Sequence, residues 1–220
     1  MSDQIRDSEG VSHRRGFFGR MAGLSALGLF GFGVTPANAQ PAQGDGPNWP
    51  GQLKGRHKQL TDVYGINDGF PLGFTNNFIT PNESATATAV MIFRHQGLPY
   101  ALNHSIWSKY RVGETFKIID PETKGVAVKN PWYEPKPGVG NPNASLDRLI
   151  ARGVVMGCCG VALRGQSGRL AQNAGVSAEE AYKEFAANLL PGMTILPSGT
   201  WGVNRAQEAG CTYCAGGTTG

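Results

Sequence analysis

Apolar residues occur along the chain in short continuous runs that alternate with segments of helical spacing. The clearest runs are ATAVMIF at residues 87–93 and VVMGC at residues 154–158. Unbroken apolar runs of this length are typical of parallel strands that are covered on both faces. Shorter strands are predicted beside turn residues within QLTDVYGI (59–66), MTILPSG (193–199) and CTYCA (211–215).

Helical patterns fill the segments between these strands. The strongest is SAEEAYKEFAANLL (177–190), in which Ser177 and Glu180 form a capping box and Pro191 follows the end. Further helices are predicted over about residues 71–79, 98–110, 145–153 and 200–210. The alternation of strands and helices predicts an α/β fold, with an open, mostly parallel sheet of about five strands, helices on both faces and a single domain.

Two segments lack any such periodicity. Residues 40–56 are rich in Pro, Gly and Gln, which predicts a flexible leader before a folded domain at 57–216. Residues 111–143 carry five prolines and several glycines, which predicts a long loop with one short hairpin within residues 116–128. A loop of that length in a compact domain is usually either functional or mobile.

The first 39 residues have the pattern of a twin-arginine export signal. Arg14 and Arg15 precede an apolar run at residues 21–34, and Ala37 and Ala39 flank a cleavage point. An apolar run of about fifteen residues is shorter than the ~20 that span a bilayer. We therefore expect a removable signal, a periplasmic or extracytoplasmic protein and no stable membrane span after cleavage, with an uncleaved tether as the alternative.

The charge of the chain excludes one class of partner. The first 39 residues carry four basic and three acidic side chains, so their removal lowers the formal net charge from +4 to +3. No Lys/Arg cluster accompanies this small excess, whereas nucleic-acid binding needs a basic patch or stripe. No nucleic-acid partner is expected.

Cys158 and Cys159 stand where an apolar strand gives way to a helix, ahead of Gly160. In an open parallel sheet, ligands and reactive groups collect at the carboxyl ends of the strands. Amides of a helix that starts near Gly160 would face the Cys159 sulfur and favour a thiolate there. Because adjacent strand positions point to opposite faces, we expect Cys158 to be a buried, inert residue and Cys159 to be the functional one.

Arg94 and His95 close the strand at 87–93, which places them at the same sheet edge as Cys159 if the strands run parallel. The histidine could hold or deprotonate a substrate, and the arginine could bind an anion such as an oxidised sulfur species. A structural strand-end pair is the alternative. Ser198, Gly199 and Thr200 begin another helix, where they either hold an anion or only cap the helix.

Cys211 and Cys214 form a C-x-x-C motif close to the end of the chain. Thioredoxin-type chemistry needs the first cysteine at a helix N-terminus, and this motif lies in a predicted strand. Two alternatives remain. The four cysteines could hold one metal ion, although adjacent residues are poor joint ligands of a tetrahedral centre, or some of them could form disulfides of undetermined connectivity. No cofactor is firmly implied.

The segments GVVMGCCGVALRG, LLPGMTILPSG and NRAQEAG, followed by CTYC, resemble the DsrE/DsrF-like family of sulfur-relay proteins. The resemblance covers about residues 145–215, and the loop at 111–143 departs from the small members of the family. It implies a flavodoxin-like, three-layer α/β fold. It also implies that Cys159, the cysteine followed by glycine, carries sulfane sulfur as a persulfide between a donor and an acceptor protein, and that Cys158 is an addition.

The resemblance further implies a homo-oligomer, a trimer or a hexamer. The sequence thus predicts an exported persulfide carrier or sulfurtransferase, with Cys159, His95 and Arg94 at its site. The alternative is a non-catalytic periplasmic oligomer or binding subunit, in which the cysteines form structural disulfides or hold a metal.

Overall fold

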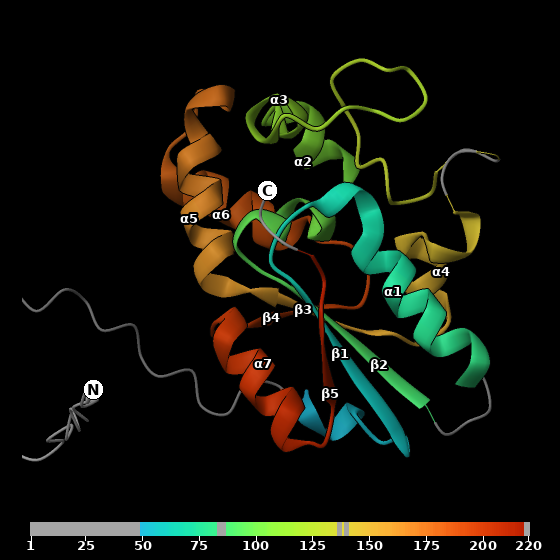
Figure 1. Ribbon diagram of the computed structural model, residues 1–220. Coiled ribbons are helices and arrows are strands. Elements are labelled where there is room, and N and C mark those ends of the chain that lie inside the picture. The colour runs from blue at the N-terminus through green and yellow to red at the C-terminus, as the bar shows by residue number, and fades with distance from the viewer. Residues whose placement is uncertain (1–48, 83–86, 136–137, 139–140, 218–220) are drawn as a thin grey trace, which may run out of the picture. The chain divides into compact units, whose positions relative to one another are not determined.

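A five-stranded sheet forms the centre of the molecule, and all of its strands are parallel (Figure 1). The computed structural model describes residues 49–82, 87–135, 138 and 141–217, which belong to one compact unit. Across the sheet the strands are β4 (Met193–Leu196), β3 (Val155–Cys159), β2 (Ala87–Phe93), β1 (His57–Val63) and β5 (Thr212–Ala215). The predicted fold class, an open parallel α/β sheet in a single domain, is confirmed.

The strand order explains how the two faces of the sheet are covered. From β1 to β4 the chain moves one place at a time in one direction, and it then returns across the sheet to place β5 beside β1. The first three connections pack on one face and contain α1 (Phe70–Ile79), α4 (Leu146–Ala151), α5 (Gly160–Leu170) and α6 (Ala178–Ala187). The last connection, α7 (Gly199–Glu208), packs on the other face.

Alternation along the strands divides the core into two parts. Met91 and Phe93 of β2 pack toward α1, α5 and α6, together with Met156 of β3. Val90 and Ile92 point the other way and pack against α7. The continuous apolar run at 87–93 is therefore explained by burial on both faces, as a central parallel strand requires.

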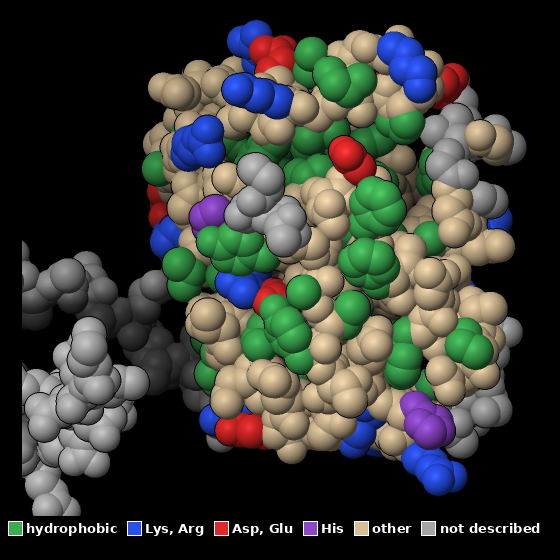
Figure 2. All heavy atoms as spheres, in the orientation of Figure 1, with side chains coloured by type: hydrophobic (Ala, Val, Ile, Leu, Met, Phe, Trp, Pro, Cys, Tyr) green, Lys and Arg blue, Asp and Glu red, His purple; other side chains and the backbone are tan. Residues whose placement is uncertain are grey.

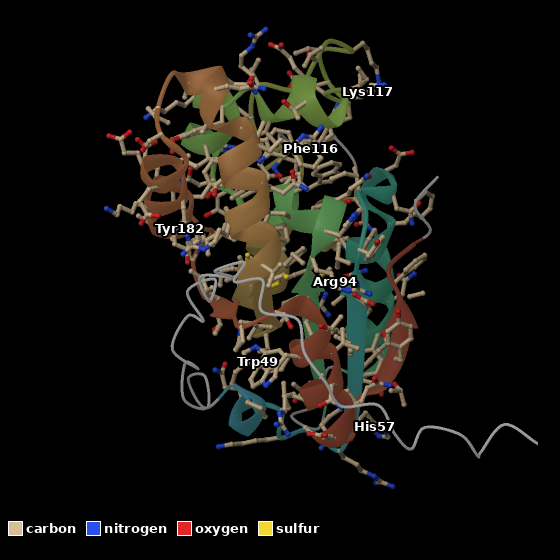
Figure 3. All side chains as sticks on the ribbon, turned by 90° about the vertical axis from the view of Figure 1, so that its left-hand side faces the viewer. Trp49, His57, Arg94, Phe116, Lys117 and Tyr182 are labelled. Carbon is tan, nitrogen blue, oxygen red and sulfur yellow. The ribbon has the colours of Figure 1, made fainter. Side chains whose placement is uncertain are left out.

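The packed structure begins earlier than the sequence indicated. Residues 49–56 were expected to belong to the flexible leader, but Trp49 and Leu53 are buried against α7 and β1, on either side of the short 3-10 helix η1 (Pro50–Gln52) (Figure 3). The reason is that Trp49 and Leu53 fill the second face, which α7 alone does not cover. The rest of the expected leader lies outside the described residues.

The long connection between β2 and β3 contains more structure than predicted. It begins with η4 (His95–Ala101) and continues through α2 (His104–Lys109), α3 (Val112–Phe116) and η5 (Pro142–Ala144). The single helix expected over 98–110 is broken because Pro99 lacks an amide hydrogen and Asn103 caps a new helix at α2. The hairpin expected within 116–128 is reduced to one antiparallel bridge between Ile119 and Val126.

The remaining elements are three short 3-10 helices. The 3-10 helices are η2 (Asn67–Gly69), η3 (Thr80–Asn82) and η6 (Ala171–Ala174). The capping box predicted for Ser177 and Glu180 is present at the start of α6, with both of its hydrogen bonds. The predicted strand at 154–158 is shifted by one residue, so that Cys159 is the last residue of β3.

The predicted export signal, with Arg14, Arg15, Ala37 and Ala39, lies outside the described residues. In the part of the chain that the structure describes, no helix has the length and apolar character needed to cross a bilayer. On the face shown in Figure 2, basic side chains lie singly or beside acidic ones and form no continuous patch.

Candidate functional site

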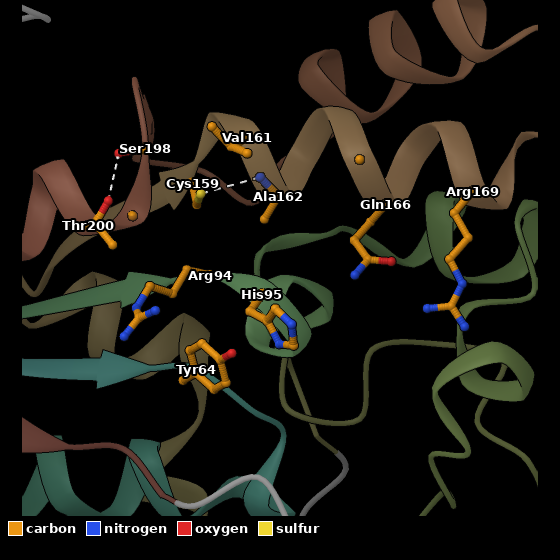
Figure 4. Close-up of a pocket in the computed structure, with 12 residues that line it drawn as sticks. Tyr64, Arg94, His95, Cys159, Val161, Ala162, Gln166, Arg169, Ser198 and Thr200 are labelled. Carbon is orange, nitrogen blue, oxygen red and sulfur yellow. Dashed lines mark hydrogen bonds between the residues drawn. The ribbon is translucent and has the colours of Figure 1, made fainter.

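A cavity of about 450 Å³ opens at the carboxyl ends of the strands (Figure 4). It lies where β3 leads to α5 on one face of the sheet and its neighbour β4 leads to α7 on the other. Adjacent strands whose connections diverge in this way leave a crevice between them, which is the usual ligand site of open α/β sheets. The topology therefore hollows the sheet edge at Cys159, which lines this cavity.

Cys159 ends β3 and is also the N-cap residue of α5. Its Sγ accepts a hydrogen bond from the amide of Ala162, at 3.3 Å. The residue is only 7% exposed, and it lines the cavity as a free thiol. A sulfur that replaces the usual Ser or Asp oxygen at an N-cap lies at the positive end of a helix, where negative charge is favoured.

Gly160 is required for this turn because β4 lies very close to it. A Cβ atom on Gly160 would lie 2.7 Å from the carbonyl oxygen of Leu196, the residue that pairs with Cys159. Only a glycine lets the backbone approach so closely.

Cys158 does not take part in the site. Its side chain is fully buried on the opposite face, in the core with Met156 and Phe93. Burial raises the pKa of the Cys158 thiol far above its ordinary value, because the thiolate cannot be solvated there.

Cys211 and Cys214 are not brought to Cys159 either. Cys214 belongs to β5 and Cys211 directly precedes that strand. β2 and β1 separate β5 from β3, a spacing of roughly 14 Å at 4.8 Å per strand. Cys211 packs with the core under α7, whereas Cys214 is paired in register with Thr61, whose hydroxyl is hydrogen-bonded to Thr75 of α1 on the other face. Burial raises the pKa of both thiols.

The four cysteines are therefore not gathered at one place in the structure. All four cysteines are free, and all four lie within the described residues. Among those residues, no group of three His, Cys, Asp or Glu side chains is placed to hold a metal ion.

Arg94 lines the cavity, but its charge is already paired. Its Nε and Nη2 each donate to a carboxylate oxygen of Asp62 at 2.7 Å, and its guanidinium lies 4.6 Å from the centre of the Tyr64 ring. The hydrogen bonds to the buried Asp62 raise the pKa of Arg94. Tyr213 donates a hydrogen bond to the same carboxylate, at 2.8 Å. The geometry thus favours the structural interpretation of Arg94 over anion binding.

His95 is exposed at the cavity wall that faces α5 (Figure 4). Its ring stacks on Tyr64, with centres 4.4 Å apart and an angle of 4° between the planes. Its backbone is left-handed, with a φ of 49°, and it turns the chain away from β2. The imidazole is therefore held at the cavity with its ring fixed by Tyr64, in a position where it can exchange a proton with a bound molecule.

The residues at the start of α7 mainly cap that helix. Ser198 accepts a hydrogen bond from the amide of Trp201 at 3.1 Å, and its hydroxyl lies 3.1 Å from that of Thr200. Gly199 allows the Arg94 side chain to pack closely against α7. A Cβ atom on residue 199 would lie 2.6 Å from the Cβ of Arg94. These residues border the cavity, and the capping interpretation explains their contacts.

Several residues that line the cavity were not predicted from the sequence, among them Tyr64, Gln166 and Arg169. Gln166 and Arg169 project from α5 beyond Cys159, on the helix face that Ala162 begins. Gln166 follows Ala162 by four residues, and Arg169 follows Gln166 by three. Residues at this spacing share one side of a helix, so the sequence could have placed both on the side of Ala162. Tyr64 follows β1, and no pattern in the sequence distinguished it.

The fold and the cavity define an open parallel α/β protein that holds a free thiol at a topological switch point. No protein-family model matches the chain, and a search of the curated proteins finds no match. The function has to be argued from the site itself.

Proposed function

We propose that this protein carries sulfane sulfur as a persulfide on Cys159. The observation that supports this most directly is the position of the Cys159 sulfur. It caps α5, accepts a hydrogen bond from the Ala162 amide and lines the cavity. The amide donor favours negative charge on the sulfur, both in the attacking thiolate and in the persulfide anion. A persulfide carrier needs these features together: a sulfur beside a hydrogen-bond donor, a small cavity and an open path to the sulfur.

The transfer step is a displacement at sulfur. With thiosulfate as donor, the Cys159 thiolate attacks the outer sulfur, the new S–S bond forms, and the sulfur–sulfur bond of the donor breaks. Sulfite leaves with the electron pair, and the protein keeps a persulfide anion. No external oxidant is needed, because the sulfane sulfur is transferred at its own oxidation level. Thiol attack of this kind proceeds fastest when the attacking sulfur is ionised and accessible.

His95 would assist when the donor is a thiol-derived persulfide. The leaving group is then a thiolate, and an imidazole at the same cavity can supply its proton. Tyr64 keeps the ring in place by stacking, and the Arg94–Asp62 pair holds the strand ends beneath it. The roles of Arg94 and His95 therefore differ: His95 faces the reacting atoms, and Arg94 is a positioning residue.

The resemblance to the DsrE/DsrF-like family supports the same proposal. It suggests an oligomer that exchanges sulfur with a donor or acceptor protein, and the N-terminal pattern with Arg14 and Arg15 suggests that this takes place outside the cytoplasm. The separation of Cys159 from Cys211 and Cys214 across the sheet favours a carrier over the alternative in which these cysteines form a structural disulfide within one chain.

The test is mass spectrometry of the purified protein after treatment with sodium polysulfide or thiosulfate. We expect sulfur to be added to Cys159 in the wild type and to be absent from this position in Cys159→Ser. Cys214→Ser is the matched control, because it removes a partly exposed thiol outside the cavity, and it should keep the adduct. Absence of any adduct from the wild type, or an unchanged adduct in Cys159→Ser, would rule out the proposal.

A further inference from the structure

The cavity extends along α5 beyond the reach of a small inorganic sulfur ion. Cys159 lies at one end, and Arg169 lies ten residues further along the helix, which corresponds to about 15 Å between backbone positions. Figure 4 shows Gln166 between them, on the same side of the helix. Thiosulfate is only a few ångströms long, so it can contact Cys159 without reaching the other end. A ligand that uses the whole cavity has to be longer.

Arg169 carries a charge that is left without an acidic partner. Among the described residues, no carboxylate forms an ion pair with it, and its recorded contact is with the ring of Phe116, 5.9 Å away. Three other arginines form ion pairs: Arg94 with Asp62, Arg164 with Glu179 and Arg205 with Glu208. An unpaired guanidinium at the rim of a cavity favours a ligand with an anionic group there. A carboxylate fits best, because its two oxygens can accept from two N–H groups of the guanidinium.

Gln166 provides an independent indication of a ligand. Its Oε1 atom is buried, yet it has no hydrogen-bond partner in the described part of the chain. Buried polar atoms without partners are rare in folded proteins, because each one loses its water without compensation. Gln166 lines the cavity between Cys159 and Arg169, so rotation of its amide about the last side-chain bond would turn Oε1 into the cavity, where an N–H group of a bound molecule supplies the missing partner.

We propose, on the basis of the persulfide function above, that the sulfur donor of this site is a short cysteine-containing peptide persulfide with a free carboxylate. Its outer sulfur reaches Cys159, a backbone N–H donates to Gln166, and its carboxylate binds Arg169. The Cys159 thiolate attacks the outer sulfur, the S–S bond of the donor breaks, and the peptide leaves as a thiolate with the electron pair. The proton of the donor persulfide remains with the transferred sulfur.

The test compares two donors with the same peptide and persulfide, glutathione persulfide with its free carboxylates and the persulfide of glutathione diethyl ester, in which both carboxylates are neutral esters. The rate of sulfur addition to Cys159 is followed by quenched mass spectrometry. Arg169→Gln should slow the reaction with the free acid about tenfold, the effect of losing one charge-assisted contact, and should leave the ester unchanged. Arg164→Gln is the matched control, because Arg164 lies on the same helix and pairs with Glu179 away from the cavity.

Gln166→Leu tests the second contact. Both peptide donors keep their N–H groups, so this variant should slow both of them and leave addition from inorganic polysulfide unchanged. Equal losses with all donors in either variant would indicate a structural role and overturn the inference. So would an absence of any loss, which is the result expected if the natural donor is a protein. Inorganic polysulfide that fails to modify wild-type Cys159 would instead count against the persulfide function itself.

Discussion

The chemistry of single residues at this site depends on how closely two strand ends approach each other. Cys159 caps α5 in the correct orientation only because Gly160 lets the chain turn against Leu196 of β4. The neighbouring Cys158, identical in chemistry, is inert because the pleat of β3 points it into the core. Two adjacent residues of one strand therefore differ in surroundings: the Cys158 side chain lies in the core and the Cys159 side chain lines the cavity.

Gly160→Ala should lower both stability and reactivity. The added Cβ would meet the Leu196 carbonyl oxygen at 2.7 Å, so the ends of β3 and β4 have to move apart. We expect a loss of about 1–3 kcal/mol in the free energy of unfolding, measured by urea denaturation, and slower sulfur addition to Cys159.

Gly168→Ala is the control on the same helix. Its Cβ would meet only the Cβ of Ala178, at an ordinary 3.7 Å. Alanine is favoured over glycine in a helix, so this variant should gain up to about 1 kcal/mol. A Gly160→Ala protein as stable as this control would show that the strand ends are not in contact as described.

At the scale of elements, the long connection between β2 and β3 is fixed by buried polar groups rather than by regular structure. The Asn130 side chain donates to the carbonyl oxygens of Tyr100 and Leu102. The backbone amide of Asn130 donates to Nδ1 of His104 at 3.1 Å. Asp62 has a similar role at the sheet, because it joins β1 to Arg94 after β2 and to Tyr213 of β5. The Asn130 contacts hold the connection together, and the Asp62 contacts hold Arg94 at the wall of the cavity.

The His104 contact makes stability depend on pH. Burial lowers the pKa of His104, and Lys129 lowers it further, while Glu134 opposes them. The unfolded chain, with a histidine pKa near 6.5, therefore takes up this proton before the folded protein does. The contribution of His104 to stability is complete above about pH 6.5 and is lost as the pH falls through the lower folded value.

His104→Asn should remove that pH dependence. Asparagine keeps an acceptor near the position of Nδ1 and does not titrate. We expect the free energy of unfolding to fall less between pH 7 and pH 5 in the variant than in the wild type, as measured by denaturant titrations at each pH. Parallel pH profiles for the two proteins would show that His104 does not contribute.

At the scale of the whole molecule, the reversal of strand order after β4 determines both the site and the second half of the core. It sends α7 to the face opposite α5, and so opens the crevice in which Cys159 lies. Among the described residues, α7 is the one α-helix that covers that face. Trp49 and Leu53 complete the cover, which is why the folded protein begins before β1.

Trp49→Ala should be among the most destabilising substitutions outside the sheet. Trp49 is fully buried and packs near Trp201 of α7, with ring centres 6.5 Å apart. We expect a loss of about 3–5 kcal/mol in the free energy of unfolding. Gln52→Ala, at an exposed position of the same segment, should change stability by less than about 0.5 kcal/mol. Similar effects of the two variants in thermal or urea denaturation would place Trp49 outside the core.

Local sequence patterns predicted helices and strands well where neighbouring residues alone determine them. The strand at 87–93 was predicted with the bounds of β2, and the capping box of α6 was predicted at Ser177 and Glu180, because burial on two faces and helix capping both act within a few residues. Predictions failed where the cause lies far away in the chain. Trp49 looked like part of a flexible leader because its aromatic partner on α7, Trp201, lies 152 residues further along the chain.

The site followed the same rule. The sequence by itself determined an alternating α/β order, a parallel sheet and a cysteine at the end of a buried strand, because strand and helix periodicity and the carboxyl edge of a parallel sheet are properties of neighbouring residues. Only the tertiary structure decided that Asp62 neutralises Arg94, that Cys211 and Cys214 lie three strands from Cys159, and that Gln166 and Arg169 line its cavity. Those relations depend on strand order and on which helix covers which face, and both are set by the packing of segments distant in the sequence.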